Sequence, residues 1–209
     1  MQTTASSHLE ETCWIESAQR GDLEAFNELI LRHQDALFNV AVRMLGDEDK
    51  AADAVQEALV SAWRSLRTFS GGSFRAWLSR AVINKCYDEF RRSSRHPVLP
   101  LVPVVDGEEL EDREWLRDPS LPLDTQMEAS ELDEAIQTCL QTLPLAHRSV
   151  LVMVDVDGMN YDEAAASLGI PIGTVKSRLA RARASLRAAL RDFSDLLPSP
   201  FQIRLPVAA

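Results

Sequence analysis

The residues with the clearest chemical potential are cations on one predicted helix near the carboxyl end. Residues 170–191 contain six basic side chains and no acidic one. At about 100° per residue, Lys176, Ser177, Ala180 and Arg181 share a face turned away from an apolar stripe. Hydrogen-bond donors and cations at the start of a helix are what reading base edges in a DNA major groove requires. The stretch therefore predicts a DNA-binding helix.

A second helix and a tight turn come immediately before it. Asn160 and Glu163 have the spacing of a capping box, Gly169 ends the first helix, and we expect Thr174 to cap the next. Tyr161 falls on the apolar face of the first helix. The pair is typical of a helix-turn-helix. The alternative, a solvated basic helix packed on its own domain, explains the charge but leaves the turn residues unexplained.

The charge distribution supports contact with DNA at two places. The whole chain has a net charge of −10 and a pI near 4.9, which by itself argues against nucleic acid. The charge is unevenly distributed, however. Residues 64–95 hold eight basic and two acidic side chains, and residues 170–191 form a second basic block. An acidic segment separates the two blocks, as expected of two DNA-binding regions in one acidic protein.

Helical periodicity dominates the first half of the chain. Three helices are predicted, over residues 22–46, 47–66 and 73–95, with a glycine-containing loop at residues 68–72. The first twelve residues carry no such pattern, so we expect a loose tail. The sequence therefore predicts an all-α bundle over residues 20–95.

The periodicity disappears between residues 96 and 129, where five prolines and nine acidic residues indicate an extended acidic linker. Such a segment can reach roughly 110 Å when fully stretched, whereas two turns of duplex DNA need only about 70 Å. Helices resume at residues 130–191, with starts predicted at Ser130 and Pro144. Residues 192–209 show no readable structure. The predicted fold is thus all-α, with two helical domains joined by the linker.

Other classes of protein find little support. The three cysteines are widely spaced, so neither a disulfide framework nor a metal site is indicated, and buried thiols in a reducing cytosol are expected. No nucleophile–base pair, phosphate-binding loop or metal cluster is recognisable, so we expect no catalytic residue, no metal and no cofactor. No apolar run is long enough to span a membrane, and no export signal is present.

Six short motifs then occur in a fixed order on the predicted elements. They are Asp53-x-x-Gln56-Glu57 with Trp63; Phe69-x-Gly71 with Trp77-Leu78; Asn84-x-x-x-Asp88-x-x-Arg91-Arg92; Leu143-Pro144; Asp157-Gly158; and Gly173-Thr174-Val175-Lys176-Ser177-Arg178. In combination they resemble the bacterial σ70 superfamily, specifically the small extracytoplasmic-function sigma factors. The resemblance covers region 2 at about residues 20–95 and region 4 at about residues 130–191.

The resemblance implies a dissociable specificity subunit of bacterial RNA polymerase, acting in the cytoplasm on a specialised, stress-responsive regulon. Region 2 would bind the clamp helices of the largest subunit and melt the −10 promoter element. Region 4 would read the −35 element and meet the flap of the second-largest subunit. An anti-sigma factor is a further expected partner, and neither enzymatic activity nor membrane insertion is implied.

The resemblance also implies roles for individual residues. Those expected to bind core polymerase are Asp53, Gln56 and Glu57. Those expected to contact the −10 element are Phe69, Ser70, Gly71, Arg80, Asn84, Lys85, Arg91 and Arg92. Those expected to contact the −35 element are Thr174, Lys176, Ser177, Arg178, Ala180 and Arg181. Two positions depart from many relatives: Ser70 replaces an arginine, and Ala180 replaces a bulkier residue in some of them.

Several alternatives remain open from the sequence. A promoter-binding regulator that never joins polymerase would explain residues 130–191 but not the motifs at residues 53–63 and 69–92. A sigma mimic that titrates an anti-sigma factor should have lost its basic DNA-binding faces, and both are present. The acidic positions at 53 and 57 also suit an ordinary solvated face, and the linker suits a simple spacer.

Overall fold

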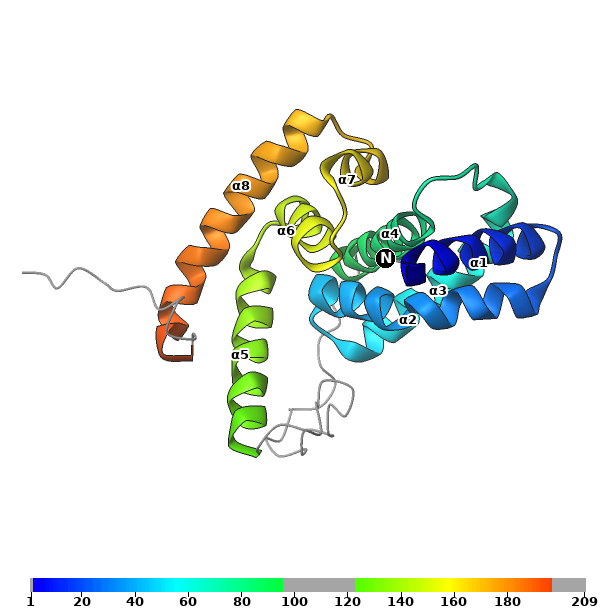
Figure 1. Cartoon of the computed structure of the whole chain (residues 1–209). Coiled ribbons are helices and arrows are strands. Elements are labelled where there is room, and N and C mark those ends of the chain that lie inside the picture. Colours follow the sequence, from blue (N-terminus) through cyan, green and yellow to red (C-terminus); the bar gives the residue numbers. More distant parts are fainter. Residues whose placement is uncertain (1, 96–122, 197–209) are drawn as a thin grey trace, which may run out of the picture.

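A computed structural model describes residues 2–95 and 123–196 (Figure 1). Every regular element within these two ranges is a helix, as predicted. The elements are α1 (Gln2–Gln19), α2 (Leu23–Leu45), α3 (Glu48–Ser65), η1 (Leu66–Thr68), α4 (Phe74–Arg95), α5 (Leu123–Thr142), α6 (Leu145–Leu151), η3 (Val152–Val156), α7 (Tyr161–Leu168), α8 (Ile172–Ala189) and η4 (Leu190–Leu196). Of these, η3 is a π-helical turn and the other η segments are 3-10 helices.

Local capping sets the ends of the helices in the first half. The Asp22 carboxylate accepts hydrogen bonds from two backbone N–H groups in the first turn of α2, and Asp47 accepts one from Lys50 at 2.9 Å. These N–H groups have no partner inside their helices, so a side-chain oxygen stabilises each start. Helix α2 ends at Gly46, whose φ of 74° lies in the left-handed region that glycine adopts most readily. The sequence predicted all three positions.

The first half, α1–α4, is a bundle whose interior is filled by aliphatic side chains from α2, α3, η1 and α4. The largest fully buried ones are Leu29, Leu37, Met44, Leu66, Leu78 and Ile83. Each contributes about 1.5–3 kcal/mol through removal of its apolar surface from water. Helix α1 packs along α2, where the guanidinium of Arg32 lies 4.4 Å from the centre of the Trp14 ring.

The second half, α5–α8, contains the predicted helix-turn-helix. The Asn160 side chain accepts hydrogen bonds from the backbone at the start of α7, and the Glu163 carboxylate accepts one from the Asn160 N–H at 3.0 Å, which completes the capping box. On α8, Val175, Leu179 and Ala182 are each at most 2% exposed, as the periodicity predicted. The basic face of α8 is therefore fixed by burial of its opposite side.

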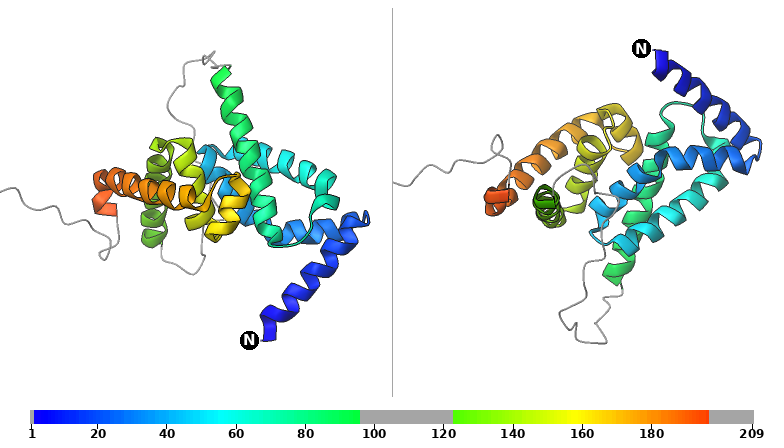
Figure 2. Two further views of the ribbon diagram at one scale, coloured as in Figure 1. Left: turned by 90° about the horizontal axis from the view of Figure 1, so that it is seen from above. Right: turned by 60° about the horizontal axis from the view of Figure 1, so that its bottom comes forward.

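The two halves pack directly against each other, as Figures 1 and 2 show. Helix α2 contacts α5, α6 and η3, and α4 contacts α7. One continuous cluster of buried apolar side chains runs through both halves. This docking was not predicted from the sequence, which indicated two separate domains.

Three boundaries differ from the predictions. The first twelve residues are not a loose tail: a helix begins at Gln2 and is held to α2 by Trp14, Ile15 and Ala18, whose apolar positions precede the first predicted cap. Helix α5 begins at Leu123 rather than at Ser130, because no proline or glycine interrupts residues 123–142. The helical chain also extends through η4, beyond the boundary predicted at residue 191.

The rest of the predicted linker, residues 96–122, and the tail from residue 197 lie outside the described residues. Within residues 2–95 and 123–196, no helix combines the length and the apolar character needed to cross a membrane.

Candidate nucleic-acid interface

The exposed face of α8 has the predicted composition. Lys176, Ser177, Ala180 and Arg181 are all exposed. The Ser177 hydroxyl donates to the backbone carbonyl of Thr174 at 3.0 Å, which orients it near the start of the helix. The result is a short row of one amine, one hydroxyl, one methyl and one guanidinium, which can meet base edges and phosphates together.

Two of the predicted −35 residues are only half exposed, and one predicted cap is wrong. Helix α8 begins at Ile172 after Pro171, so Thr174 lies inside its first turn and its N–H donates to the Pro171 carbonyl at 2.8 Å. Pro171 occupies the N-cap position with an extended backbone (φ −60°, ψ 144°), so the helix begins earlier than a cap at Thr174 would place it. Thr174 and Arg178 are half-buried, so they contribute less surface than the row around Arg181.

Tyr161 lies beside the exposed face of α8, although the sequence assigned it to a buried face. It is 37% exposed, and the amine of Lys176 lies 5.8 Å from the centre of its ring. The first residue of an α-helix has no preceding turn to pack against, which explains the exposure. Its ring therefore extends the surface of α8 across the start of α7.

Arg183, also on α8, is held by a carboxylate. Its Nε and Nη2 donate to the two oxygens of Asp155 at 2.9 Å and 2.5 Å. These hydrogen bonds raise the pKa of Arg183 further above its ordinary value. Asp155 lies on η3, so the pair fixes α8 to the preceding π-helical turn, and Arg183 is less available to DNA than Arg181 or Arg187.

In the first half, the loop before α4 is anchored by an aromatic cluster. The Phe69 ring lies 5.4 Å from Phe74 and 5.5 Å from Trp77, and its backbone carbonyl accepts a hydrogen bond from Gln19 of α1 at 2.8 Å. Phe69 is thus half-buried and holds the loop in place. Ser70 and Gly71, with the neighbouring glycine, are the exposed part of the predicted −10 loop.

An open groove of about 240 Å³ lies between α3 and α4, next to this loop. It is lined by Ser61, Ala62, Ser65, Trp77, Arg80, Ala81, Asn84 and Lys85. Three of these, on α4, are predicted −10 residues: Arg80, Asn84 and Lys85. An amide and two cations beside an indole ring can hold an unstacked base and its phosphates.

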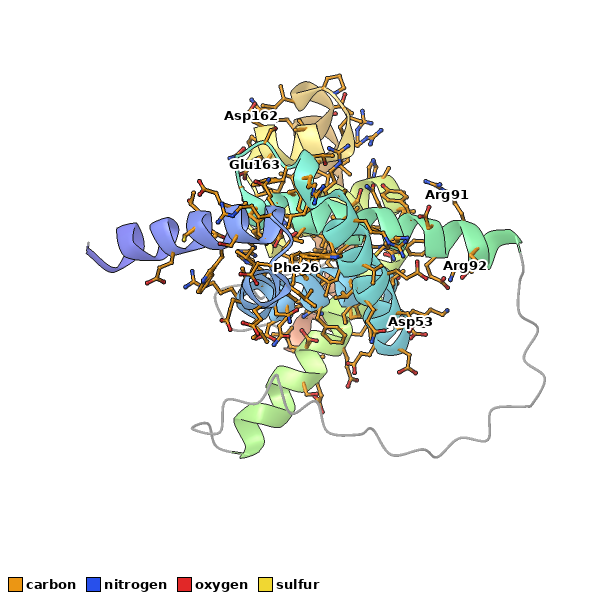
Figure 3. All side chains as sticks on the ribbon, turned by 90° about the vertical axis from the view of Figure 1, so that its right-hand side faces the viewer. Phe26, Asp53, Arg91, Arg92, Asp162 and Glu163 are labelled. Atoms are coloured by element: carbon orange, nitrogen blue, oxygen red, sulfur yellow. The ribbon has the colours of Figure 1, made fainter. Side chains whose placement is uncertain are left out.

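The predicted polymerase face and the predicted −10 face meet at Glu57. On α3, Asp53, Gln56 and Glu57 are exposed, as their wheel positions predicted. The Glu57 carboxylate lies 3.2 Å from the Lys85 amine and 3.8 Å from a guanidinium nitrogen of Arg92. Figure 3 shows Asp53 on the same side of the molecule as Arg91 and Arg92, whereas Asp162 and Glu163 lie on α7 at the other end.

An exposed apolar residue that sequence reasoning missed, Val60, lies on α3 beside the predicted polymerase face. It is 50% exposed and follows Gln56 by one helical turn. From the sequence, Val60 was assigned neither to the buried stripe of this helix nor to its exposed face. An exposed apolar side chain beside three polar ones is a common composition for the centre of a protein-binding face.

Comparison with known proteins identifies the family to which this chain belongs. Two family models match, Sigma-70 region 2 over residues 29–96 and Sigma-70, region 4 over residues 133–186, and together they cover more than half of the chain. The chain belongs to the σ70 family of sigma factors. It is an extracytoplasmic-function member, a transcription initiation factor that directs RNA polymerase to promoters.

Relatives match over most of their length. The sigma factor is 34% identical to the RNA polymerase sigma-H factor of Pseudomonas aeruginosa, over 85% of this chain and 92% of that protein. It is 32% identical to the ECF RNA polymerase sigma-E factor of Escherichia coli K12, over 87% of this chain and 94% of that protein.

Two solved structures have a fold similar to that of this chain. CnrH in complex with the cytosolic domain of CnrY has a TM-score of 0.61 and 28% identity, covering 87% of this chain and 97% of CnrH. The sigma factor RpoE of Bartonella quintana, in complex with the anti-sigma factor NepR, has a TM-score of 0.59 and 28% identity. It covers 79% of this chain and 96% of that one.

Proposed function

We propose that this sigma factor docks on the clamp helices of core RNA polymerase through α3, opens the −10 element at the groove between α3 and α4, and reads the −35 element with α8. The observation that supports this most is the position of Glu57, between the exposed face of α3 and the cations of α4. One pair of helices then carries both polymerase docking and strand opening. A regulator that never joins polymerase would need neither a polymerase-docking face nor a strand-opening groove.

On this proposal, α3 contributes Asp53, Gln56, Glu57 and Val60 to the contact with polymerase. Acidic and amide groups around one apolar side chain suit a basic coiled-coil partner, and such charge complementarity affects association rate and specificity most. The cations of α4 hold the single strand, and Asn84 reads a base at the groove. Ser70 and Gly71 form the loop edge, while Phe69 supports that loop from below.

For the −35 element, Arg181 is the residue we assign to base reading, together with Lys176 and Ser177. Arg187, further along α8, is assigned to phosphate. Ala180 offers only a methyl group, which suits apolar contact with a thymine. This division separates sequence-specific from general affinity.

The wider role follows from the family. We infer that the protein acts in the bacterial cytoplasm, at the nucleoid when joined to polymerase, and controls a stress-responsive set of genes. We also infer that it has no enzymatic activity and that an anti-sigma factor holds it inactive. One similar solved structure, the sigma factor RpoE of Bartonella quintana, is a complex with the anti-sigma factor NepR, which supports the last point.

Run-off transcription tests the proposal. Purified core polymerase is mixed with the sigma factor and a template carrying candidate −35 and −10 elements, and promoter-dependent transcripts are measured. We expect transcripts only with the sigma factor present. DNA binding without any transcript, and without copurification of core polymerase, would favour the plain regulator.

A charge reversal tests the docking face. We expect Glu57→Lys, or Asp53→Ala combined with Gln56→Ala, to abolish capture of core polymerase while the helical circular dichroism stays unchanged. Glu28→Lys is the matched control, because it makes the same charge change at an exposed position on α2. If core polymerase is captured equally well by the wild type and by both variants, α3 is not the docking surface.

A further inference from the structure

The last residue of α1, Gln19, joins this helix to the segment that precedes the −10 loop. Its side-chain nitrogen Nε2 donates to the backbone carbonyl of Phe69 at 2.8 Å and to that of Leu66 at 3.2 Å. The two acceptors lie 50 and 47 residues further along the sequence. An amide NH2 group has two donors, so one side chain satisfies both carbonyls at once.

These carbonyls lie at the two ends of η1, the 3-10 turn that leads from α3 into the loop (Figure 1). Leu66 is the first residue of η1, and Phe69 follows the last one. The Leu66 carbonyl also accepts from the Phe69 N–H at 3.0 Å, which closes the turn. At Phe69 the backbone becomes extended, with φ −70° and ψ 114°. Gln19 therefore holds the turn at both ends and sets the direction in which the chain leaves it.

The loop itself has little to hold its shape. Residues 70–72 are exposed. Gly71 and Gly72 have φ values of 110° and 91°, and a side-chain carbon added to either would have no described neighbour within 4 Å. Glycine loses more conformational freedom on ordering than any other residue. The loop therefore depends on its two ends, which are Phe69 on one side and Ser73 on the other, where the Ser73 hydroxyl accepts from a backbone N–H of α4 at 3.2 Å.

Phe69 connects this fixed turn to the groove between α3 and α4. Its ring lies 5.5 Å from that of Trp77, and Trp77 lines the groove together with Asn84. The Phe69 ring also lies 5.4 Å from Phe74, which is 2% exposed and stacks on Trp77 at 5.6 Å. Gln19 holds the backbone of Phe69 and the aromatic neighbours hold its ring. Together they fix the orientation of the whole residue, and with it the edge of the loop beside the groove.

The position of Gln19 is itself well fixed. Ala18, next to it, is 3% exposed, and its carbonyl accepts from the Gly21 N–H at 2.9 Å. The Ser17 carbonyl accepts from the Asp22 N–H at 3.2 Å, so α1 turns directly into the capped start of α2. Gln19 also lies before residue 29, where the match to Sigma-70 region 2 begins.

We infer that Gln19 is a positioning residue for promoter opening, which makes the end of α1 a part of the −10 reader. It acts through Phe69: its two hydrogen bonds hold the loop in the shape that receives the unstacked strand, and Gln19 does not touch DNA itself. A loop that is ordered before binding loses less entropy when it captures its ligand. The effect on DNA rests on the proposed function of the loop, whereas the hydrogen bonds that hold the loop do not.

Hydrogen exchange in the whole protein tests whether Gln19 holds the loop. Gln19→Met keeps the length of the side chain and removes both donors, and Gln34→Met is the matched control at an exposed position on α2. Mass spectrometry of peptides that cover residues 66–73 reports the local opening of this segment. Loss of one such hydrogen bond shifts an equilibrium roughly 2- to 12-fold, so we expect Gln19→Met to speed exchange at least about threefold. We expect no change in the control.

Strand binding tests the consequence for the promoter. Holoenzyme assembled from core polymerase and each variant is titrated with a fluorescent single strand that carries the −10 sequence, and with a scrambled strand. We expect Gln19→Met to lower the preference for the −10 strand at least about threefold, while capture of core polymerase and binding of a −35 duplex stay unchanged. Gln19→Lys supplies donors of sufficient reach and should restore the preference. The ratio between the two strands cancels the general effect of its added charge.

The outcomes separate this inference from the proposed function. Equal loop exchange in Gln19→Met and Gln34→Met would overturn it, and so would faster exchange with an unchanged preference for the −10 strand. Failure of Gln19→Lys to restore both measurements would also count against it, because the donors would then not be what matters. If the wild-type holoenzyme shows no preference for the −10 strand, the proposed function of the loop fails, and the exchange result still decides whether Gln19 holds it.

Discussion

Substitution of Arg181 gives the sharpest test of how α8 reads DNA. The side chain is exposed, and the helix beneath it is fixed by fully buried positions such as Val175 and Ala182. Arg181→Ala should therefore leave the fold and the melting temperature unchanged. If the guanidinium pairs with a guanine, the loss is about 1–3 kcal/mol, or roughly 5- to 150-fold in affinity, and it applies only to the correct sequence.

Arg187→Ala is the matched control on the same helix. Arg187 points in nearly the same direction as Lys176 but lies about 16 Å further along the axis. At that distance it is expected to reach phosphate rather than base edges. Its loss should weaken binding to every sequence alike and reduce the slope of log affinity against log salt by about 0.9.

Fluorescence anisotropy with matched and scrambled −35 duplexes, at two salt concentrations, measures both effects. The reasoning requires a sequence-selective loss for Arg181→Ala and a sequence-independent, salt-sensitive loss for Arg187→Ala. Equal losses of Arg181→Ala on both duplexes would show that this arginine contacts only the backbone.

Three other predictions follow from the first half. Asn84→Ala should reduce permanganate reactivity of thymines near −10 with core polymerase, while Asn27→Ala, at an exposed position on α2, should not; equal melting by the two variants would make Asn84 structural. Val60→Asp should weaken capture of core polymerase without lowering the melting temperature, and unweakened capture would exclude this residue from the docking face. At pH 8, Cys13 should react with iodoacetamide while Cys86 reacts only after unfolding, as mass spectrometry would show. Burial raises the pKa of Cys86 from 9.0 to about 12, so its contribution to stability is present below pH 9 and is lost as the pH rises towards 12.

The sequence predicted the features that depend on neighbours within one helical turn. Asn160, Asp22 and Gly46 cap their helices as expected, because a cap is decided by the residue itself and by the adjoining turn of the helix. The exposed face of α8 was predicted for the same reason: periodicity of the buried positions leaves only one direction for Lys176 and Arg181.

Features that depend on distant partners were missed. The carboxylate of Asp157 is paired with Arg75, 82 residues away, and no local pattern records how the halves dock. Trp14 was given no role from the sequence, because its partner Arg32 lies on the next helix. Tyr161 was placed inside because an aromatic on an apolar spacing usually is, yet the end of a helix offers less surface to bury it.

Where the two halves dock, the buried Arg148 of α6 donates through Nη1 to the Met44 carbonyl of α2 at 2.6 Å, a contact with a consequence for how such proteins diverge. Met44 contributes only its backbone carbonyl, which every residue type at that position would supply equally well. A change at position 44 therefore needs no compensating change at position 148, although the fully buried Met44 side chain keeps that position apolar. Arg43 and Asp133 meet through their side chains, so replacement of one selects for replacement of the other. Co-variation between positions usually signals spatial contact. It would thus reveal the Arg43–Asp133 ion pair and miss the buried contact between Arg148 and the Met44 carbonyl.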